Sequence, residues 1–575
     1  MILQALTDYY ERQARDPASG IPPFGFSEQK ISFCAVLSKT GELAGIVDLR
    51  EDESGKLRPK RITVPASVIR TGNPLANFLW DNTGYVLGAG SHEKLTSDPE
   101  RFVRYFEVFL ALHREIAAET RDGGINALVA FLEKWSPSRA PSLSGWQAIS
   151  DSNLVFRLEE DSEYLHERPM LREAWLRRFE SGFDGPTAWC LVTGEKKSVA
   201  VLHPPIKGAS SVQAPLVSFN ENAYESYGKS KSINAPVSEH AAFAYSTALN
   251  HLLRAGSRQR IRIGDATTVF WAERSTKAED LLAALFNPSL EANTEDPGEP
   301  LDDPATTALV REVLKAAKEG RPLREVDASL DSDARFYVLG LSPNKARLAV
   351  RFWNVSTFGQ LVLHLGRHYR AMEVERQFEG DPEYPPFWQI LLETAALRKN
   401  KNVPPLLAGA LTRSVLTGLP YPRSLFTTIL GRIRADHVVN YLRAAILKAY
   451  LVRNHQMEVS MSLDIERRNP AYRLGRLFAL LEKAQKDATN PTATIRDRYF
   501  GAASATPAAV FPQLLRLGQH HISKAEYGGY TDKLIAEVVD EIDELPNHLS
   551  LEDQGLFTLG YYHQRNALFR KSEKE

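Results

Sequence analysis

The segment Ser218–Leu253 places side chains that suit phosphates and base edges directly before a long alanine-rich helical pattern. Lysines bind phosphate groups, amides read base edges, and tyrosines stack on bases or hydrogen-bond to either. No carboxylate lies between Glu225 and Glu239. The candidate contacts are Asn220, Tyr224, Tyr227, Lys229, Lys231 and Asn234. The alternative interpretation is a polar connector whose Ser238 caps the following helix.

Cations in the C-terminal third fall in rows along predicted helices. One row spans about an 80° arc at about 100° per residue; it consists of Arg473, Arg476 and Lys483. Arg432 and Arg443 are eleven residues, about three turns, apart on one face of a pattern that runs through residues 423–455. Such rows follow a phosphate backbone without reading sequence. They also occur on the outside of ordinary helical bundles, which is the alternative.

Charge is sorted along the chain, although the net charge is only −1. Residues 388–525 contain 20 Lys and Arg against 8 Asp and Glu, whereas residues 526–554 contain one lysine against nine carboxylates. Residues 54–80 carry five Lys and Arg and no acid. A neutral total is therefore compatible with polyanion binding by separate basic regions.

Composition excludes several classes of protein. The 575 residues predict two to four domains, and 43% hydrophobic with 25% charged residues is typical of globular proteins. No run of about 18 apolar residues occurs, and an acidic residue stands at position 8, so we predict neither a membrane span nor a signal peptide. Cys34 and Cys190 are too few for a disulfide framework. We expect a cytoplasmic protein without membrane, metal or cofactor.

Two enzyme signatures are incomplete. Gly228-Lys229-Ser230 ends like a phosphate-binding P-loop, but Ala223 stands where the first glycine belongs. His364 and His368 have the spacing of zincin ligands without the catalytic glutamate, so we predict a surface histidine pair.

A third signature leaves an alternative open. Asp184, Glu195 and Lys197 mimic the spacing of a restriction-type nuclease core, in which carboxylates bind a metal ion. Residues 195–197 fall at a predicted hairpin tip, where exposed charges are ordinary. We therefore expect no catalytic residue, and metal-dependent cleavage is the alternative.

The elements that must position these groups form an α+β N-terminal part and a C-terminal helical bundle. Alternating patterns predict strands at residues 30–38, 42–49, 60–68, 334–342 and 347–355, and a hairpin at 188–203. Beyond about Pro386 the strand signal disappears, and Asn469-Pro470 begins a helix. We predict a mixed α/β region with antiparallel sheets over 1–290, an α+β continuation over 291–385 after an acidic linker at 286–304, and a helical bundle over 386–575.

Seven segments, in this order, are specific to one family. They are ILQALTDYYERQ, CLVTGEKKSVAVLHPPIKG, SFNENAYESYGKSKSINAPVSEHAAFAYSTALN, TTVFWAE, FYVLGLSPNKARLAVRFW, NPAYRLGRLFALLEKAQ and IRDRYFGAASATPAAVFPQLL. Through them the chain resembles, nearly end to end, the large subunit of the type I-C CRISPR Cascade complex (Csd-type, Dvulg subtype).

The resemblance implies a non-catalytic role in antiviral defence. The N-terminal domain of this family inspects duplex DNA for the protospacer-adjacent motif and helps to open it into an R-loop, and the C-terminal bundle stabilises the displaced strand. Protein then reads the short motif, and RNA pairing reads the rest. The implied partners are CRISPR RNA, target double-stranded DNA, the RNA-handle endonuclease subunit, the repeated backbone subunit, the small subunit and, transiently, a helicase–nuclease.

The residue chemistry and the resemblance together assign candidate contacts. For the duplex they are the Ser218 loop residues named above and a second set, Lys56, Arg58, Lys60, Arg61, Arg70 and Asn73. The cations at 432, 443, 473, 476 and 483 are the candidates for strand backbone. Two alternatives stay open: the Ser218 loop docks the RNA-handle subunit, or the whole chain is a scaffold that touches no nucleic acid.

The resemblance also implies an internal translation start, because in this subtype the small subunit is commonly made from the large-subunit gene. Met457 and Met461 are the last two of five methionines. A start at Met457 gives residues 457–575, a helical piece that resembles a small subunit. The alternative is two ordinary structural methionines.

Overall fold

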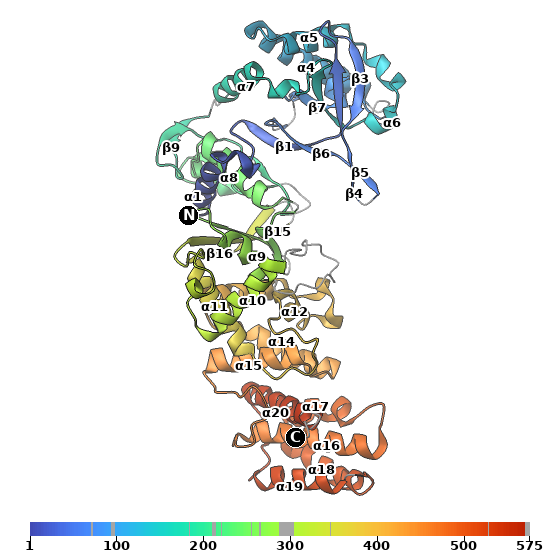
Figure 1. The fold of residues 1–575 in the computed structure, drawn as a ribbon, viewed down its shortest axis with the longest axis vertical. Coiled ribbons are helices and arrows are strands. Elements are labelled where there is room, and N and C mark those ends of the chain that lie inside the picture. The colour runs from blue at the N-terminus through green and yellow to red at the C-terminus, as the bar shows by residue number, and fades with distance from the viewer. Residues whose placement is uncertain are drawn as a thin grey trace. The chain divides into compact units, whose positions relative to one another are not determined.

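In a computed structural model the chain forms two compact units (Figure 1). Unit 1 comprises Met1–Ile206 and Gln213–His251, and unit 2 comprises Lys207–Val212 and Leu252–Glu575. The structure describes residues 1–569 except 54, 69, 71–72, 92, 94–97, 183–184, 210–213, 220, 255, 264–265, 287–303, 345–346 and 527. Nearly all of the predicted acidic linker is thus outside the described residues, and the boundaries near 290 and 385 stay predictions.

Unit 1 is built on a four-stranded sheet of order β3-β2-β8-β7. Its strands are β2 (Phe33–Leu37), β3 (Leu43–Asp48), β7 (Trp80–Asn82) and β8 (Asn153–Leu158). The all-apolar β2 is buried along its length, between antiparallel β3 and parallel β8. Four antiparallel ribbons complete the strands described in this unit: β1 (Phe26–Ile31) with β6 (Lys60–Pro65), β4 (Glu51–Glu53) with β5 (Lys56–Arg58), β9 (Thr187–Trp189) with β10 (Lys196–Ser198), and β11 (Pro205–Ile206) with β12 (Ala214–Pro215).

Helices α2 (Thr83–Val86) and α5 (Gly123–Lys134) contact this sheet, and further helices are described elsewhere in the unit. The further helices are α1 (Ile2–Ala14), α4 (Pro99–Glu119), α6 (Trp146–Ile149), α7 (Pro169–Ser181) and α8 (Glu239–Leu252). Aspartates start two of them: Asp98 accepts from the Arg101 N–H at 3.1 Å, and Asp122 accepts from the Gly124 N–H at 2.7 Å. Helix α5 packs against β2 and β8, and Phe109, Phe131 and Trp175 belong to the shared core.

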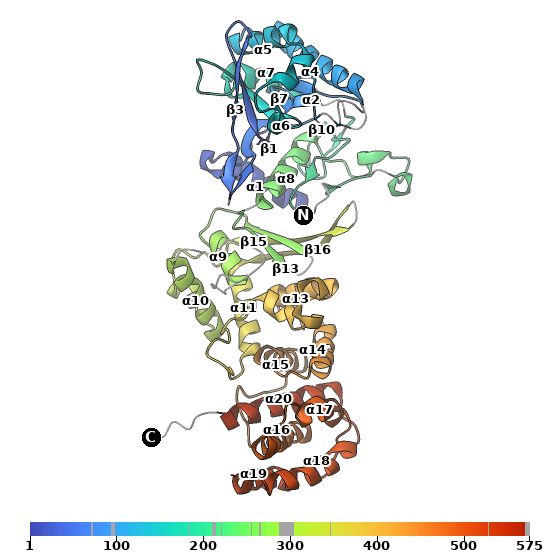
Figure 2. The ribbon, with the colours of Figure 1, turned by 90° about the vertical axis from the view of Figure 1, so that its right-hand side faces the viewer.

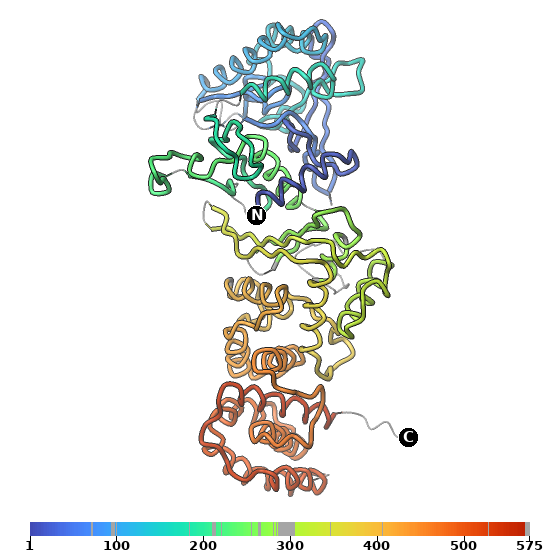
Figure 3. The backbone as a smooth tube through the Cα atoms, turned by 90° about the vertical axis from the view of Figure 1, so that its left-hand side faces the viewer, coloured from blue at the N-terminus to red at the C-terminus, as the bar shows by residue number. Residues whose placement is uncertain are grey.

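Unit 2 begins with an antiparallel sheet whose strands follow chain order. They are β13 (Arg260–Ile263), β14 (Ala266–Ala272), β15 (Arg335–Asn344) and β16 (Arg347–Thr357), and Figure 3 shows β15 and β16 as a long hairpin. Tyr337 stacks on Trp353 with ring centroids 5.6 Å apart, a cross-strand aromatic pair that stabilises the hairpin. Three helices accompany the sheet: α9 (Ala278–Phe286) packs against β14, α11 (Phe358–Met372) packs against β16, and α10 (Pro304–Glu319) packs against both helices.

The remainder of unit 2 is helical, so the predicted fold class is confirmed. The helices are α12 (Phe387–Leu392), α13 (Pro405–Thr417), α14 (Arg423–Asp436), α15 (Tyr441–His455), α16 (Pro470–Thr489), α17 (Ile495–Ala505), α18 (Pro507–Ile522), α19 (Gly528–Asp540) and α20 (Leu551–Phe569). One continuous hydrophobic core joins the sheet to these helices. As predicted, Asn469 caps α16 by accepting from the Tyr472 N–H at 3.0 Å.

Helices α16 and α20 cross with their backbones in direct contact (Figure 1). A Cβ added to Gly475 lies 2.0 Å from the Phe557 carbonyl oxygen, and one added to Gly560 lies 2.1 Å from the Tyr472 carbonyl oxygen. Real Cβ atoms do not approach backbone so closely, so only glycine fits at the crossing. The two glycines set how near the two helices come.

Three sequence-based expectations need correction. The predicted strand at 30–38 belongs to two strands in different sheets, because Ser32 interrupts the extended segment between β1 and β2. The helical pattern through 423–455 is two helices: His437 adopts a left-handed conformation with φ 54°, and Asn440 caps α15 through the Arg443 N–H at 2.8 Å. The sheets are antiparallel as predicted, apart from the parallel β2–β8 pair.

Candidate nucleic-acid interface

The loop at residues 221–234 is held in one shape by the side chain of Asn234. Its Oδ1 accepts from the Ser226 N–H at 2.9 Å, and its Nδ2 donates to the carbonyls of Lys229 and Lys231, both at 2.8 Å. The Lys231 N–H donates to Glu225 Oε1 at 3.2 Å. The amide predicted to read a base edge therefore uses both its ends inside the loop, and its direct contact with DNA stays a prediction.

The tip of this loop presents an aromatic ring to solvent. Ser226 and Lys229 form an antiparallel bridge, and the two residues between them have positive φ, 55° at Tyr227 and 68° at Gly228. Consecutive positive φ values define a type I′ turn, in which a tyrosine is unusual. The Tyr227 side chain is 99% exposed, and Lys229 and Lys231 are exposed beside it. Figures 2 and 3 show this green segment extending away from α8.

The base of the loop is tied to α8 and to the β9–β10 hairpin. Ser238 caps α8 as predicted, because its Oγ accepts from the Ala241 N–H at 3.3 Å. The Ser238 N–H donates to the Cys190 Sγ at 3.2 Å, and the Thr193 N–H does so at 3.5 Å. Burial acts to raise the pKa of Cys190, but these hydrogen bonds outweigh it and lower the pKa to about 7. The loop therefore connects to a capped helix, as one interpretation predicted, and it also holds Tyr227 in an exposed position.

The second predicted set lies mainly on two ribbons of unit 1. Lys56 and Arg58 are exposed on β5, opposite Glu53 and Glu51 of β4. Two further cations form surface ion pairs: Lys60 with Glu51 at 3.1 Å and Arg61 with Glu28 at 2.5 Å. Exposed pairs of this kind contribute little stability, so these cations can exchange partners at small cost. Asn73 is exposed, and Asn220 lies outside the described residues.

Arg70 has a structural position within the second set. Its Nη2 donates to the buried Asp81 carboxylate at 2.5 Å, its Nε donates to the Leu75 carbonyl at 2.7 Å, and its guanidinium lies 4.1 Å from the Tyr85 ring centroid. Burial raises the pKa of Asp81, and Arg70 partly opposes that shift. Arg70 is thereby tied to Leu75 and Asp81.

The helical cations predicted to track a strand are tied to partners in unit 2. Arg432 and Arg443 do not share one helix face, since they lie on α14 and α15; both bind Asp436 instead. Arg443 is 2% exposed and also binds Glu393 at 2.9 Å. A guanidinium enclosed by two carboxylates is placed to stabilise the α14–α15 junction.

The row on α16 is confirmed as a helix face, but its members also have internal partners. Arg473 binds Glu541 at 3.0 Å, Arg476 donates to Gln564 at 3.1 Å, and Lys483 binds Asp487 at 2.5 Å. Arg476 is buried, which lowers its pKa. Contact of these cations with a strand backbone stays a prediction.

The two candidate start methionines lie between α15 and α16. Met457 is partly buried against the core of unit 2, and its N–H donates to the Leu451 carbonyl at 3.2 Å. Met461 is exposed, and its carbonyl accepts from the Glu375 N–H at 2.8 Å. The next helix, α16, begins only at Pro470, so a start at either methionine leaves α16–α20 whole.

Comparison with known families decides the affiliation of the chain. The family described as CRISPR-associated protein (Cas_Csd1) matches residues 6–569. The chain belongs to this family. No curated protein matches it significantly. The match agrees with the resemblance to a type I-C large subunit, and it makes this Cas_Csd1 member a Cascade-type subunit that works with other CRISPR-associated proteins.

The two histidines of this Cas_Csd1 member are not an exposed pair, contrary to prediction: His368 is buried and His364 is partly buried. His364 Nδ1 lies 2.7 Å from the Leu416 carbonyl oxygen, and His368 Nδ1 lies 2.5 Å from the Tyr421 hydroxyl. Burial lowers the pKa of His368 to about 3, so its ring is neutral. The sequence pattern missed this because α11 packs against α13, which supplies Leu416.

The described part of the chain does not show the arrangement of carboxylates that the nuclease alternative requires. Glu195 and Lys197 are exposed on the predicted hairpin and pair with each other at 2.5 Å, and Asp184 lies outside the described residues. Among described residues, no three His, Cys, Asp or Glu side chains gather as metal ligands do. The described helices also include none with the length and apolarity needed to cross a bilayer.

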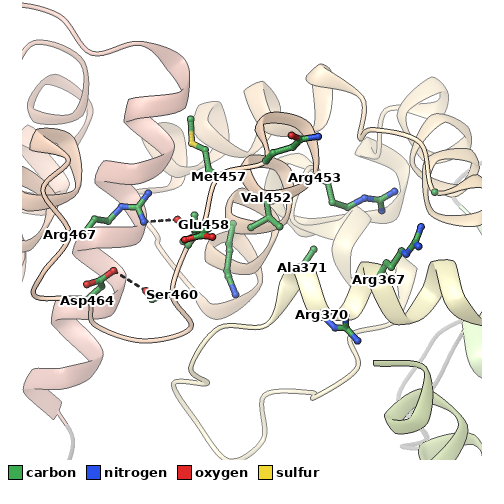
Figure 4. A pocket seen from close by; sticks show the side chains of 14 residues that line it. Arg367, Arg370, Ala371, Val452, Arg453, Met457, Glu458, Ser460, Asp464 and Arg467 are labelled. Atoms are coloured by element: carbon green, nitrogen blue, oxygen red, sulfur yellow. Dashed lines mark hydrogen bonds between the residues drawn. The ribbon is translucent and has the colours of Figure 1, made fainter. Parts of the chain in front are cut away.

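Sequence reasoning missed a gathering of cations around a pocket in unit 2 (Figure 4). Its cationic members come from α11, α15 and the segment after α15: Arg367, Arg370, Lys448, Arg453 and Arg467. Arg367 and Arg370 are three residues apart, which places them on one helix face. That spacing was a signal in the sequence, but the packing of 456–467 against α11 and α15 was not.

Proposed function

We propose that this Cas_Csd1 protein is the large subunit of a type I-C Cascade effector and acts without catalysis of its own. In this role it recognises the protospacer-adjacent motif in duplex DNA, promotes R-loop formation, stabilises the displaced strand and supports recruitment of the helicase–nuclease. Its partners are CRISPR RNA, target DNA, the RNA-handle endonuclease subunit, the repeated backbone subunit and the small subunit. The family membership supports this role at the level of the complex.

The observation that carries the duplex-reading part is the rigid loop at 221–234. An exposed tyrosine costs free energy at a positive φ, and Asn234 holds it there with Lys229 and Lys231 alongside. A ring that can stack on or wedge against bases, beside lysines that can meet phosphates, suits contact with duplex DNA. Because the loop is pre-shaped, little ordering entropy is lost on contact.

The test uses the assembled complex and a duplex that bears the motif. We expect Lys229→Ala to weaken all duplexes similarly and to reduce the slope of log K against log salt by about 1. We expect Tyr227→Ala to lower affinity by about 1–3 kcal/mol, the range for loss of a stacked base, and to lessen the difference between correct and altered motifs. Binding measured by fluorescence anisotropy at two salt concentrations gives both quantities.

The matched control is Lys39→Ala, which removes an exposed lysine elsewhere in unit 1. It should leave affinity and salt slope unchanged. Wild-type binding by a Tyr227→Ala/Lys229→Ala double variant would show that the loop does not read the duplex.

One observation favours the docking alternative for the same region. Three large apolar side chains are exposed on or beside the β9–β10 hairpin, namely Trp189, Leu191 and Leu202. If this surface binds the RNA-handle subunit, Trp189→Ser should reduce co-purification of that subunit. The motif preference of the complex that still assembles should then be unchanged, which separates docking from DNA reading.

A further inference from the structure

Unit 2 contains a pocket of about 790 Å³ between α11, α15 and the segment that follows α15 (Figure 4). Five cationic and two acidic side chains line it; the acidic ones are Glu458 and Asp464. Among the described residues, no ion pair joins either carboxylate to any of the five cations. Asp464 instead accepts from the Ser460 hydroxyl at 2.9 Å. The pocket therefore has a formal excess of three positive charges.

Two of the arginines are held at the pocket by hydrogen bonds to backbone carbonyls. Arg453 donates through Nη2 to the carbonyls of Ser414 and Leu419, at 3.1 and 2.6 Å, while its buried Nη1 has no partner among the described residues. Arg467 donates through Nη1 to the Glu458 carbonyl at 2.7 Å, and its buried Nε likewise has no described partner. These two nitrogens are enclosed by protein, so the two arginines contribute to the pocket through the charge of their guanidinium groups.

The arginines are fixed in position rather than free to swing. The Arg453 guanidinium lies 4.2 Å from the Tyr421 ring centroid, and the Arg467 guanidinium lies 5.6 Å from that of Tyr472. Lys448 is buried and donates to the Glu373 carbonyl. Arg367, by contrast, is exposed at the rim, and Figure 4 shows it directed towards the same space as Arg453. Pre-oriented guanidinium groups favour planar, bidentate binding of phosphate.

We propose that this pocket binds the phosphate of a nucleotide unit, either free or within a single strand. The excess positive charge and the exposed rim arginine Arg367 favour an oxyanion with several acceptor oxygens. Apolar side chains on the same walls, Ala371, Val452, Met457 and Val459, give a surface for a sugar or base. The volume is in the range of sites for small organic ligands. The proposal is independent of motif reading, because no residue of unit 1 takes part.

The test compares Arg367→Glu with Arg516→Glu in the full chain. Arg367 is exposed without a described ion pair, so its substitution reverses charge at the rim and leaves the fold intact. Arg516 is exposed on α18, away from the pocket lining, and gives the same change of charge. The probes are inorganic phosphate, thymidine 5′-monophosphate and a 5′-labelled oligothymidylate, with affinity measured by calorimetry or anisotropy.

We expect Arg367→Glu to weaken binding about tenfold or more, as for removal of one charge-assisted hydrogen bond, and Arg367→Lys to recover most of it. Arg516→Glu should bind as the wild type does. Arg367-dependent binding of the monophosphate identifies a free nucleotide as the ligand, and the same dependence for the oligonucleotide alone identifies a strand phosphodiester. Equal affinities in wild type and Arg367→Glu for all three probes, or an equal reduction in Arg516→Glu, overturn the proposal. Neither result affects the Tyr227 and Lys229 test in unit 1.

Discussion

At the scale of single residues, the hydrogen-bonding groups of a side chain do not reveal which partners it binds. Asn234 has the right chemistry for a base edge, yet it satisfies three backbone groups of its own loop. Arg443 has the right charge for a phosphate, yet two carboxylates enclose it. Such local partners come from turns and packing, and a residue type alone does not reveal them.

Asn234→Ala should weaken duplex binding and lessen motif preference as Tyr227→Ala does, because Asn234 acts through the Tyr227 turn. The substitution removes three loop hydrogen bonds, each worth about 1 kcal/mol, so the Tyr227 turn loses its fixed shape. The measurement is affinity of the assembled complex for a panel of motif variants. Asn222→Ala, in the same exposed loop, is the control and should have little effect. A further loss of motif preference when Asn234→Ala is added to Tyr227→Ala would instead identify Asn234 as a base reader.

Arg443→Ala should destabilise the protein by about 3–5 kcal/mol, because it leaves the buried Glu393 and the partly buried Asp436 without their shared partner. Urea unfolding monitored by circular dichroism measures this loss. Arg398→Ala removes a more exposed partner of Glu393 and should cost much less. If Arg443→Ala keeps full stability but loses single-strand binding, the strand-contact prediction is right and the structural role of Arg443 is wrong.

At the scale of elements, capping residues were the most reliable signals in the sequence. Ser238 and Asn469 start α8 and α16 as predicted. The break between α14 and α15 was missed, although Asn440 is also a cap, because apolar residues continue on both sides of it. The loop at 221–234 was found as a candidate, but its turn at Tyr227 was not, since nothing in the residue type favours a positive φ there.

A start at Met457 should yield a second product that contains α16–α20. A C-terminal tag detects it by immunoblot, and Met457→Leu with Met461→Leu should abolish it while the full-length product remains. If the small product is absent, or persists in the double variant, internal initiation at these sites is excluded.

The same product should be less soluble alone than within the full chain. In the full chain, α14 and α15 pack against α20: Arg434 binds Gln554, and Phe426 lies 2.7 Å from where a Cβ would stand on Gly555. Release of residues 457–575 uncovers this face, which includes buried aromatic groups such as Tyr562. The free piece therefore needs a partner surface.

At the scale of the whole molecule, the distribution of charge matters more for polyanion binding than the net charge does. A chain near neutrality still places Lys56 and Arg58 on one ribbon, and five cations around one pocket. We expect Lys56→Ala with Arg58→Ala to reduce the salt slope for duplex binding by the assembled complex by about 2, one for each phosphate that is no longer neutralised. Lys39→Ala with Arg177→Ala, which removes two exposed cations of the same unit, is the control. An unchanged slope in the first variant would remove the β4–β5 ribbon from the duplex-binding surface.

The glycine crossing of α16 and α20 has a consequence for the history of the family. A methyl group at Gly475 or Gly560 drives the two backbones apart, at a cost of about 1–3 kcal/mol for overpacking. Homologues that keep this pair of helices can vary widely on their outer faces, but they should rarely carry another residue at either crossing point. Lineages that do carry one should show a shifted helix opposite it, because the atoms in the way are backbone, so these two positions record whether the bundle is inherited intact.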